Sequence, residues 1–344
     1  MIKQKQTIFF LFILMNCLLN AQLIHQNDFN TESNWDSAYN FNRRTNFTHH
    51  TNGGYNNSGY IQVKVSKGEH YGGEMKFIFA NNNLQDPQEI YAQYKVYYES
   101  TMDSYSGKSP GFDGTRGVAG WGNKSSDGTN GWSARGSISP SGATKTRNRY
   151  YVYHKDMSRA NGKTWGDSWY WSGGNSTMQH NTWYTVEQYI KVNDVSSSNG
   201  VLKAWIDGVK VFEKINIRFT TTSNNNFDKV YAYWFNYYHG GSAVSPKDAY
   251  IRIDDFKLST NAILSVANNG INTVTIFPNP AKNYISIEGA KDLNSIEIID
   301  LNGKIVISKK GDFKKIDISA LSKGVYFLKL RKENSIKLQK LIKN

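Results

Sequence analysis

YAQYKVYY at residues 91–98 and RYYVYH at residues 149–154 decide the fold of this chain. Both runs are rich in tyrosine and valine, which favour β-strands, and the side chains of a strand alternate between the two faces of a sheet. Between the runs lie the glycine-rich segment GKSPGFDG, residues 107–114, and GWSARG, residues 131–136. We therefore expect residues 91–154 to form neighbouring strands of one sheet.

Further short strands are expected on both sides of this stretch. YIQVKV at residues 60–65 alternates cleanly, as a half-buried strand does. Asp207-Gly208 separates two alternating runs and predicts a tight hairpin. Sustained helical spacing is hard to find, whereas strand-like runs recur at residues 75–79, 182–192, 201–212, 230–238 and 249–258. Many short strands with regular turns predict an all-β protein, an antiparallel β-sandwich of the jelly-roll kind.

Composition points to sugar rather than to nucleic acid as a ligand. Aromatic residues make up 14% of the chain, with 22 Tyr and 9 Trp, and sugar rings stack on such flat faces. The net charge of +13 belongs mainly to the two ends, because residues 22–273 hold 25 basic and 21 acidic residues. Overall charge is therefore weak evidence for a polyanion, and we expect no nucleic-acid partner.

Residues 1–21 have the pattern of a signal peptide. Lys3 and Lys5 precede an apolar run, residues 8–15, and Ala21 ends the segment as a small residue at a plausible cleavage site. Cys17 is the one cysteine, and the large Asn16 before it argues against a lipid anchor. The run is too short to span a membrane. We expect an exported mature protein without disulfides and without a membrane anchor.

The remaining chain divides into a large domain, residues 22–258, a polar connection, residues 259–273, and a small module, residues 274–344. The module resembles the C-terminal sorting domain that the type IX secretion system reads. The resemblance is carried by FPNP at 277–280, DLNGK at 300–304 and LSKGVY at 321–326. It implies a small β-sandwich and the secretion machinery as a partner; a small binding module is the alternative.

Five side chains of the central stretch could serve one reaction. Alternation places Ser133 with Arg135 on one face, and Tyr151 with Tyr153 on another strand's face, while Lys108 lies in the glycine-rich segment. β-Elimination of a uronic acid needs positive charge on the carboxylate, a base for the C5 proton and an acid for the leaving oxygen. Cations and phenols meet these needs. Taken singly, each residue also fits an ordinary surface or core position.

The central stretch resembles the jelly-roll polysaccharide lyases that act on alginate, glucuronan and ulvan. The resemblance rests on GKSPG at 107–111, WSAR at 132–135 and YVY at 151–153, with support from WIDG at 205–208, HGG at 239–241 and DDF at 254–256. It implies that Lys108, Ser133 and Arg135 bind and neutralise the substrate carboxylate, and that Tyr151 and Tyr153 transfer protons. No cofactor or metal is then required for catalysis, and a structural calcium remains open.

The sequence also departs from the family pattern. Ser109 stands where the family usually has leucine, and the segment before Tyr151 is long and basic, with Lys145, Arg147 and Arg149. Such a segment either binds sulfate groups, as in ulvan, or is a solvated turn. Gln93, Arg147 and Arg149 are further candidates for binding substrate. Among neutral bases, His239 is preferred as a catalytic candidate, because His154 points away from its strand neighbour Tyr153.

Two other function classes are open from sequence alone. A non-catalytic carbohydrate-binding jelly roll would share the framework motifs. A glycoside hydrolase would need two nearby carboxyl groups, and the acidic Glu-x-Asp-x-x-Glu pattern is absent from the sequence. We expect a secreted polysaccharide lyase for an anionic, uronic-acid polymer, with an ulvan-like substrate favoured over alginate and glucuronan.

Overall fold

The computed structural model describes residues 23–158, 165–172, 176–241, 243–260, 262, 274–289, 293–300, 304–332 and 335–344. The predicted signal peptide and nearly all of the predicted connection lie outside these residues. Strands dominate, and the helices within the described part are single turns: η1 (Arg44–Asn46), η2 (Tyr55–Asn57), η3 (Ala80–Asn82), η4 (Ser100–Ser104) and η6 (Asn224–Asn226). None of the described helices is long and apolar enough to cross a membrane.

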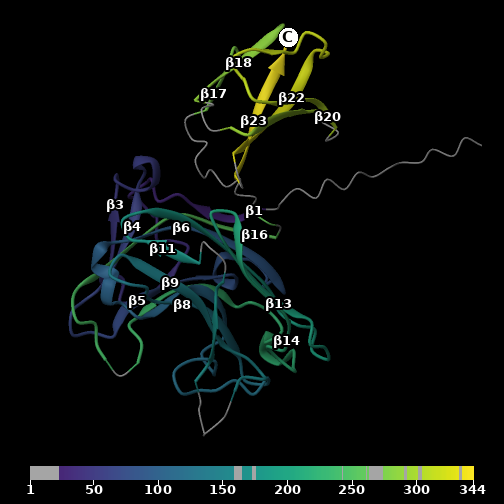
Figure 1. Cartoon of the computed structure of the whole chain (residues 1–344). Helices are drawn as coiled ribbons and strands as arrows, with labels where there is room; N and C mark the ends of the chain where they lie inside the picture. The colour runs from purple at the N-terminus through teal and green to yellow at the C-terminus, as the bar shows by residue number, and fades with distance from the viewer. Residues whose placement is uncertain are drawn as a thin grey trace, which may run out of the picture.

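Two antiparallel sheets build the larger domain (Figure 1). The first, here called the A sheet, has the order β14 (Val209–Ile217), β13 (Gly200–Ile206), β12 (Trp183–Lys191), β6 (Glu89–Tyr98), β16 (Ala249–Ser259), β4 (Tyr60–Val65) and β3 (Phe47–His50), with β1 (Leu23–Asn27) paired to β16. The predicted antiparallel jelly-roll sandwich is therefore confirmed.

The second sheet, here called the B sheet, carries the candidate site. Its order is β10 (Asp167–Tyr170), β9 (Lys145–Tyr153), β8 (Trp132–Pro140), β7 (Gly107–Gly114), β15 (Ala232–Tyr238), β5 (Tyr71–Ile78) and β2 (Asn40–Asn42), with β11 (Thr177–Gln179) paired to β9. The two aromatic runs that predict the fold therefore lie in different sheets: residues 91–98 in β6 of the A sheet, and residues 149–153 in β9 of the B sheet.

The two sheets pack through large aromatic side chains. Tyr94 of β6 meets Phe235 of β15 with ring centroids 5.8 Å apart, and Phe235 packs edge-on against Phe256 of β16 at 4.8 Å. Tyr150 and Val152 of β9 are also fully buried on this side. Burial of such apolar surface is the main stabilising contribution to the sandwich. Because alternate residues of β9 enter the core, Arg149, Tyr151 and Tyr153 are left on the opposite face.

A bulge in β7 decides which face Lys108 takes. Lys108 pairs with Ser137 of β8, whereas Gly111 pairs with Arg135, so the pairing shifts by one residue between Ser109 and Gly111. In a regular strand Lys108 and Phe112 would share a face. The extra residue separates them: Phe112 enters the core, and Lys108 stays with Ser137 and Arg135 on the outer face.

The C-terminal residues form a second hydrophobic core. One of their two sheets has the strand order β17 (Thr275–Phe277), β18 (Tyr284–Glu288) and β21 (Ile316–Asp317). The other has the order β20 (Ile305–Lys310), β19 (Ser295–Ile299), β22 (Gly324–Lys332) and β23 (Ser335–Lys343). Ile285, Ile298 and Leu328 are fully buried there. This cluster shares no described residue with the core of the larger domain.

Candidate active site

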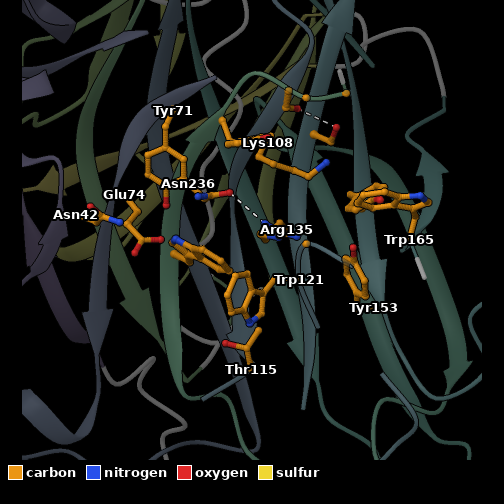
Figure 2. A pocket seen from close by; sticks show the side chains of 18 of the residues that line it. Asn42, Tyr71, Glu74, Lys108, Thr115, Trp121, Arg135, Tyr153, Trp165 and Asn236 are labelled. Carbon is orange, nitrogen blue, oxygen red and sulfur yellow. Dashed lines mark hydrogen bonds between the residues drawn. The ribbon is translucent and has the colours of Figure 1, made fainter. Parts of the chain in front are cut away.

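A cleft of about 1040 Å³ lies on the outer face of the B sheet, the face away from the core (Figure 2). Strands β5, β7, β8, β9 and β15 form its floor, and loop residues such as Trp121 and Trp165 stand at its margin. Its charged and polar lining side chains are Asn42, Tyr71, Glu74, Lys76, Ser106, Lys108, Thr115, Arg135, Ser137, Arg149, Tyr151, Tyr153, Asn236 and Tyr238.

One cross-strand row carries two of the cleft's cations. Lys108 of β7 pairs with Ser137 of β8, and Ser137 pairs in turn with Arg149 of β9. The Arg149 guanidinium donates to the Ser137 hydroxyl at 3.2 Å and to the Tyr170 hydroxyl at 3.1 Å. These bonds fix the guanidinium beside Lys108 without neutralising it.

The neighbouring row places a third cation beside the two phenols. Arg135 of β8 pairs with Tyr151 of β9, and the Lys108 ammonium lies 3.5 Å from the centroid of the Tyr151 ring. Tyr151 and Tyr153 have ring centroids 5.6 Å apart, as alternation predicts for residues sharing a face. Arg135 is only 6% exposed and donates to the Asn236 side-chain oxygen at 3.2 Å.

Within the part of the chain that the structure describes, none of the three cations Lys108, Arg135 and Arg149 forms an ion pair with an acidic side chain. Burial, together with Arg135 and Arg149 nearby, holds the pKa of Lys108 well below its usual value. Unpaired, partly desolvated positive charge of this kind favours an anionic ligand, whose binding would relieve the repulsion.

Burial also affects the protonation of Tyr153, one of the two candidates for proton transfer. It raises the pKa of the Tyr153 phenol, an effect that Tyr151 strengthens and Arg135 opposes. Tyr153 therefore keeps its proton at neutral pH and can donate it. Tyr153 is only 1% exposed but is among the residues that line the cleft, whose cations would stabilise negative charge on a neighbouring oxygen.

Trp234 forms part of the floor between two cations. The Lys76 ammonium lies 4.0 Å and the Arg135 guanidinium 4.9 Å from its ring. Lys76 also forms an ion pair of 2.9 Å with the fully buried carboxylate of Asp113. The charge of Lys76 is thus compensated within the protein, unlike that of Arg135.

Three predicted site residues lie outside the cleft. Gln93 is on the A sheet, where its amide donates to Glu187 at 3.2 Å, so its assignment to substrate binding is wrong. His239 borders the cleft through its backbone pairing with Gly107, but its side chain is 5% exposed, packs edge-on against Tyr105 at 5.3 Å and is not among the lining side chains, which argues against it as the base. Arg147 shares the face of Arg149 on β9 but lies beyond the cleft.

Ser133 requires a separate correction. It shares the face of Arg135, as alternation predicts, yet it is fully buried and donates to the Gly120 carbonyl at 2.6 Å. The loop between β7 and β8 covers it, so the hydroxyl is not available to a substrate. Ser137, two residues beyond Arg135 on the same strand, lines the cleft in its place.

Sequence reasoning missed several lining residues. Ser137 could have been found, because alternation from Arg135 leads directly to it. The cleft also contains two residues of β15, which lies beside β7, and two of β5, which lies beside β15: Trp234 and Asn236, and Tyr71 and Glu74. Their strands were predicted in part, but no local pattern indicates that they neighbour Lys108.

Comparison with known proteins agrees with this geometry. The model of the polysaccharide lyase 14 family matches residues 55–256, and that of the secretion system C-terminal sorting domain matches residues 275–344. No curated protein sequence is significantly similar to the chain.

Solved structures show the same fold. The alginate lyase Aly36B is 21% identical, with a TM-score of 0.53 over 68% of this chain and 95% of that one. The alginate lyase vAL-1 from Chlorella virus is 15% identical, with a TM-score of 0.52 over 69% and 99%. The family 14 alginate lyase from Aplysia kurodai is 16% identical, with a TM-score of 0.50 over 65% and 90%. The model of polysaccharide lyase family 14 covers more than half of the sequence, so the chain belongs to that family, and it carries a C-terminal secretion sorting domain.

Proposed function

We propose that this chain is a secreted enzyme that cleaves a uronic-acid polysaccharide by β-elimination. The observation that carries the proposal is the group of three unpaired cations, Lys108, Arg135 and Arg149, around the phenols of Tyr151 and Tyr153 in one cleft. The sorting domain supports export by the type IX system to the cell surface or beyond.

Positive charge is the first requirement of the reaction. The C5 proton of a uronate is too weakly acidic while the adjacent carboxylate keeps its full charge. Lys108 and Arg135 are placed to bind that carboxylate, and they stabilise the enolate-like intermediate that forms when the proton leaves. Desolvation of both cations strengthens this interaction, because the local dielectric is lower than that of water.

Two proton transfers complete the reaction. A base takes the C5 proton, the electron pair forms the C4–C5 double bond, and the C4–O bond breaks with protonation of the leaving oxygen. In our proposal the Tyr151–Tyr153 pair carries out both transfers. Tyr153, whose pKa is raised by burial, donates its proton to the leaving oxygen, and Tyr151, acting as a phenolate beneath the Lys108 ammonium, accepts the C5 proton. Proton exchange with water then restores the Tyr151 phenolate and the Tyr153 phenol for the next turnover.

The favoured polymer is sulfated and ulvan-like. Lys145, Arg147 and Arg149 follow one another on the same face of β9, so positive charge extends beyond the cleft along this strand. That extension supports additional anionic groups such as sulfate. Alginate and glucuronan are the alternatives. The alginate lyases that share the fold are too distant in sequence to decide the polymer.

A lyase assay tests the proposal directly. Purified full-length protein is incubated with ulvan, glucuronan and alginate, and the unsaturated uronate product is followed by its ultraviolet absorbance. We expect the absorbance to rise with at least one polymer, most with ulvan. Binding of the polymers without any new absorbance would instead support a carbohydrate-binding module.

The assignment of charge neutralisation to Lys108 and Arg135 predicts independence from metals. Treatment with EDTA should leave the initial rate nearly unchanged, because the side chains themselves supply the positive charge. The rate and the circular dichroism spectrum are measured together. A loss of rate that calcium restores, with an unchanged spectrum, would mean that a metal neutralises the carboxylate.

A further inference from the structure

The cleft has an acidic side opposite its cationic side. Asn42 of β2 pairs with Glu74 of β5, and Glu74 pairs with Asn236 of β15, so the three side chains form one cross-strand row. Figure 2 shows Asn42, Glu74 and Tyr71 grouped on the side of the cleft opposite Tyr153 and Trp165. The Asn236 oxygen that ends this row accepts the hydrogen bond from Arg135.

Glu74 gives this side an excess of negative charge. Lys76 lies near both Asp113 and Glu74, and both carboxylates raise its pKa, but among the described residues it forms its ion pair with Asp113 at 2.9 Å, and Glu74 forms none. The influence of Glu74 reaches into the cleft: after burial, the Glu74 carboxylate is the largest cause of the raised pKa of Tyr71. Glu74 is half-buried, so water screens it only in part.

We propose that Glu74 makes this side of the cleft a subsite for a sugar that presents hydroxyls and no acidic group toward it, next to the subsite in which Lys108 and Arg135 bind the uronate. A carboxylate accepts hydrogen bonds and donates none, so it suits the hydroxyl groups of a neutral ring. The Asn42 amide supplies both a donor and an acceptor beside it. A second uronate there would bring its carboxylate against Glu74, and like charges in contact disfavour binding.

The inference rests on the proposed function and narrows its substrate class. The chain should prefer polymers in which the uronate is followed, on this side, by a sugar that presents hydroxyls. A polyuronate carries a carboxylate on every ring and should be the poorer substrate. In a sulfated polymer, the sulfate should face the Arg149 side and not Glu74.

Two substitutions of opposite sign test the role of Glu74 in the full-length protein. Glucuronan, with a carboxylate on every ring, is compared with a polymer in which glucuronate alternates with neutral sugars. Glu74→Gln should raise kcat/KM on glucuronan about tenfold and lower it on the alternating polymer, because an amide accepts fewer hydrogen bonds from sugar hydroxyls than a carboxylate does. Asn42→Asp adds a second negative charge to the same row and should lower kcat/KM on glucuronan below the wild-type value.

Salt and a matched control separate charge from folding. Added NaCl should narrow the difference between the kcat/KM values of the wild-type enzyme on the two polymers, and Glu74→Gln should abolish this salt effect. Glu32→Gln makes the same charge change at an exposed residue outside the cleft and should behave as wild type, with equal Tm.

The dissociation constants of both polymers, measured by affinity electrophoresis, keep the two proposals distinguishable. If Glu74→Gln shifts the relative affinities but no variant shows turnover, β-elimination is wrong while the neutral subsite is supported. The neutral subsite is overturned if Glu74→Gln lowers turnover and affinity equally for both polymers. It is also overturned if the glucuronan-to-alternating-polymer ratios of kcat/KM and of the dissociation constant both stay unchanged.

Discussion

At the scale of single residues, the cleft combines groups whose ordinary protonation is disturbed. Lys108 is half-buried beside two other cations, and the Tyr153 phenol is buried beside another phenol. A merely structural site would pair such charges internally, as Lys76 is paired with Asp113. Strongly perturbed groups that converge in a cleft are typical of catalytic sites.

Tyr153→Phe should abolish most of the activity. The substitution removes one oxygen and keeps the ring that packs beside Tyr151. Loss of a general acid lowers the rate about 10²–10⁴-fold, so kcat in the absorbance assay should fall by that factor, with substrate affinity largely retained.

Tyr150→Phe is the control for this substitution. Tyr150 faces the core, and its hydroxyl donates to the Lys203 carbonyl at 2.8 Å. The loss of that bond should cost about 1 kcal/mol of unfolding free energy and leave kcat near wild type. Near-normal turnover in both Tyr151→Phe and Tyr153→Phe would show that the two phenols only pack.

The lowered pKa of Lys108 predicts weaker binding at alkaline pH. Burial and the neighbouring arginines favour the neutral amine, so Lys108 loses its charge at a lower pH than an ordinary lysine. KM for a uronate polymer should therefore rise as the pH increases through this lowered pKa. Lys108→Arg keeps its charge over the whole range and should remove the alkaline rise in KM, although kcat falls. An unchanged pH profile would contradict the role of Lys108 in carboxylate binding.

At the scale of elements, the bulge in β7 connects the core to the chemistry. It allows Phe112 to fill the core while Lys108 faces the cleft. At Gly111 the backbone of β7 lies close to that of β8: a Cβ there would lie 2.3 Å from the Ala134 carbonyl oxygen and 2.6 Å from the Arg135 Cα. The close approach of the two backbones therefore requires glycine.

Gly111→Ala should lower both stability and activity. The added methyl group forces β7 and β8 apart, at a cost of about 1–3 kcal/mol of unfolding free energy, and displaces Lys108 relative to Arg135. Tm and kcat are measured on the same preparation. Gly240→Ala is the steric control for stability, since its Cβ would meet nothing closer than the Ser106 carbonyl oxygen at 3.6 Å. A Gly111→Ala enzyme with wild-type Tm and kcat would refute this account of the bulge.

At the scale of the whole molecule, the described residues form two separate cores. The larger core joins the A and B sheets, and the smaller one lies within residues 274–341. Every residue that lines the cleft belongs to the larger domain. The chemistry and the export signal therefore reside in different parts of the chain.

Removal of residues 274–344 should leave the enzyme active. Because neither the cleft nor the larger core uses these residues, kcat and the Tm of the larger domain should match those of the full chain. In the secreting cell, the same truncation should abolish export, and intact-mass analysis of the natural secreted enzyme should show that the tail has been removed. Retention of the tail, or loss of activity on truncation, would contradict this division.

The sequence by itself determined the local part of the answer. Alternation with a period of two follows from strand geometry alone, so it identified the strands and the shared face of Tyr151 and Tyr153. It also placed Arg135 correctly, and the order of the short motifs indicated the family. These features depend on residues close together in the chain.

Only the tertiary structure decided which strands became neighbours and what covered them. The cross-strand rows bring Glu74 and Asn236 into the cleft from segments far from Lys108, and they leave Gln93 on the other sheet. Burial by a loop removed Ser133 from the site, although its face was predicted correctly. Strand order, bulges and loop coverage arise from contacts between distant segments. They are selected by the packing of the whole core, and no local pattern records them.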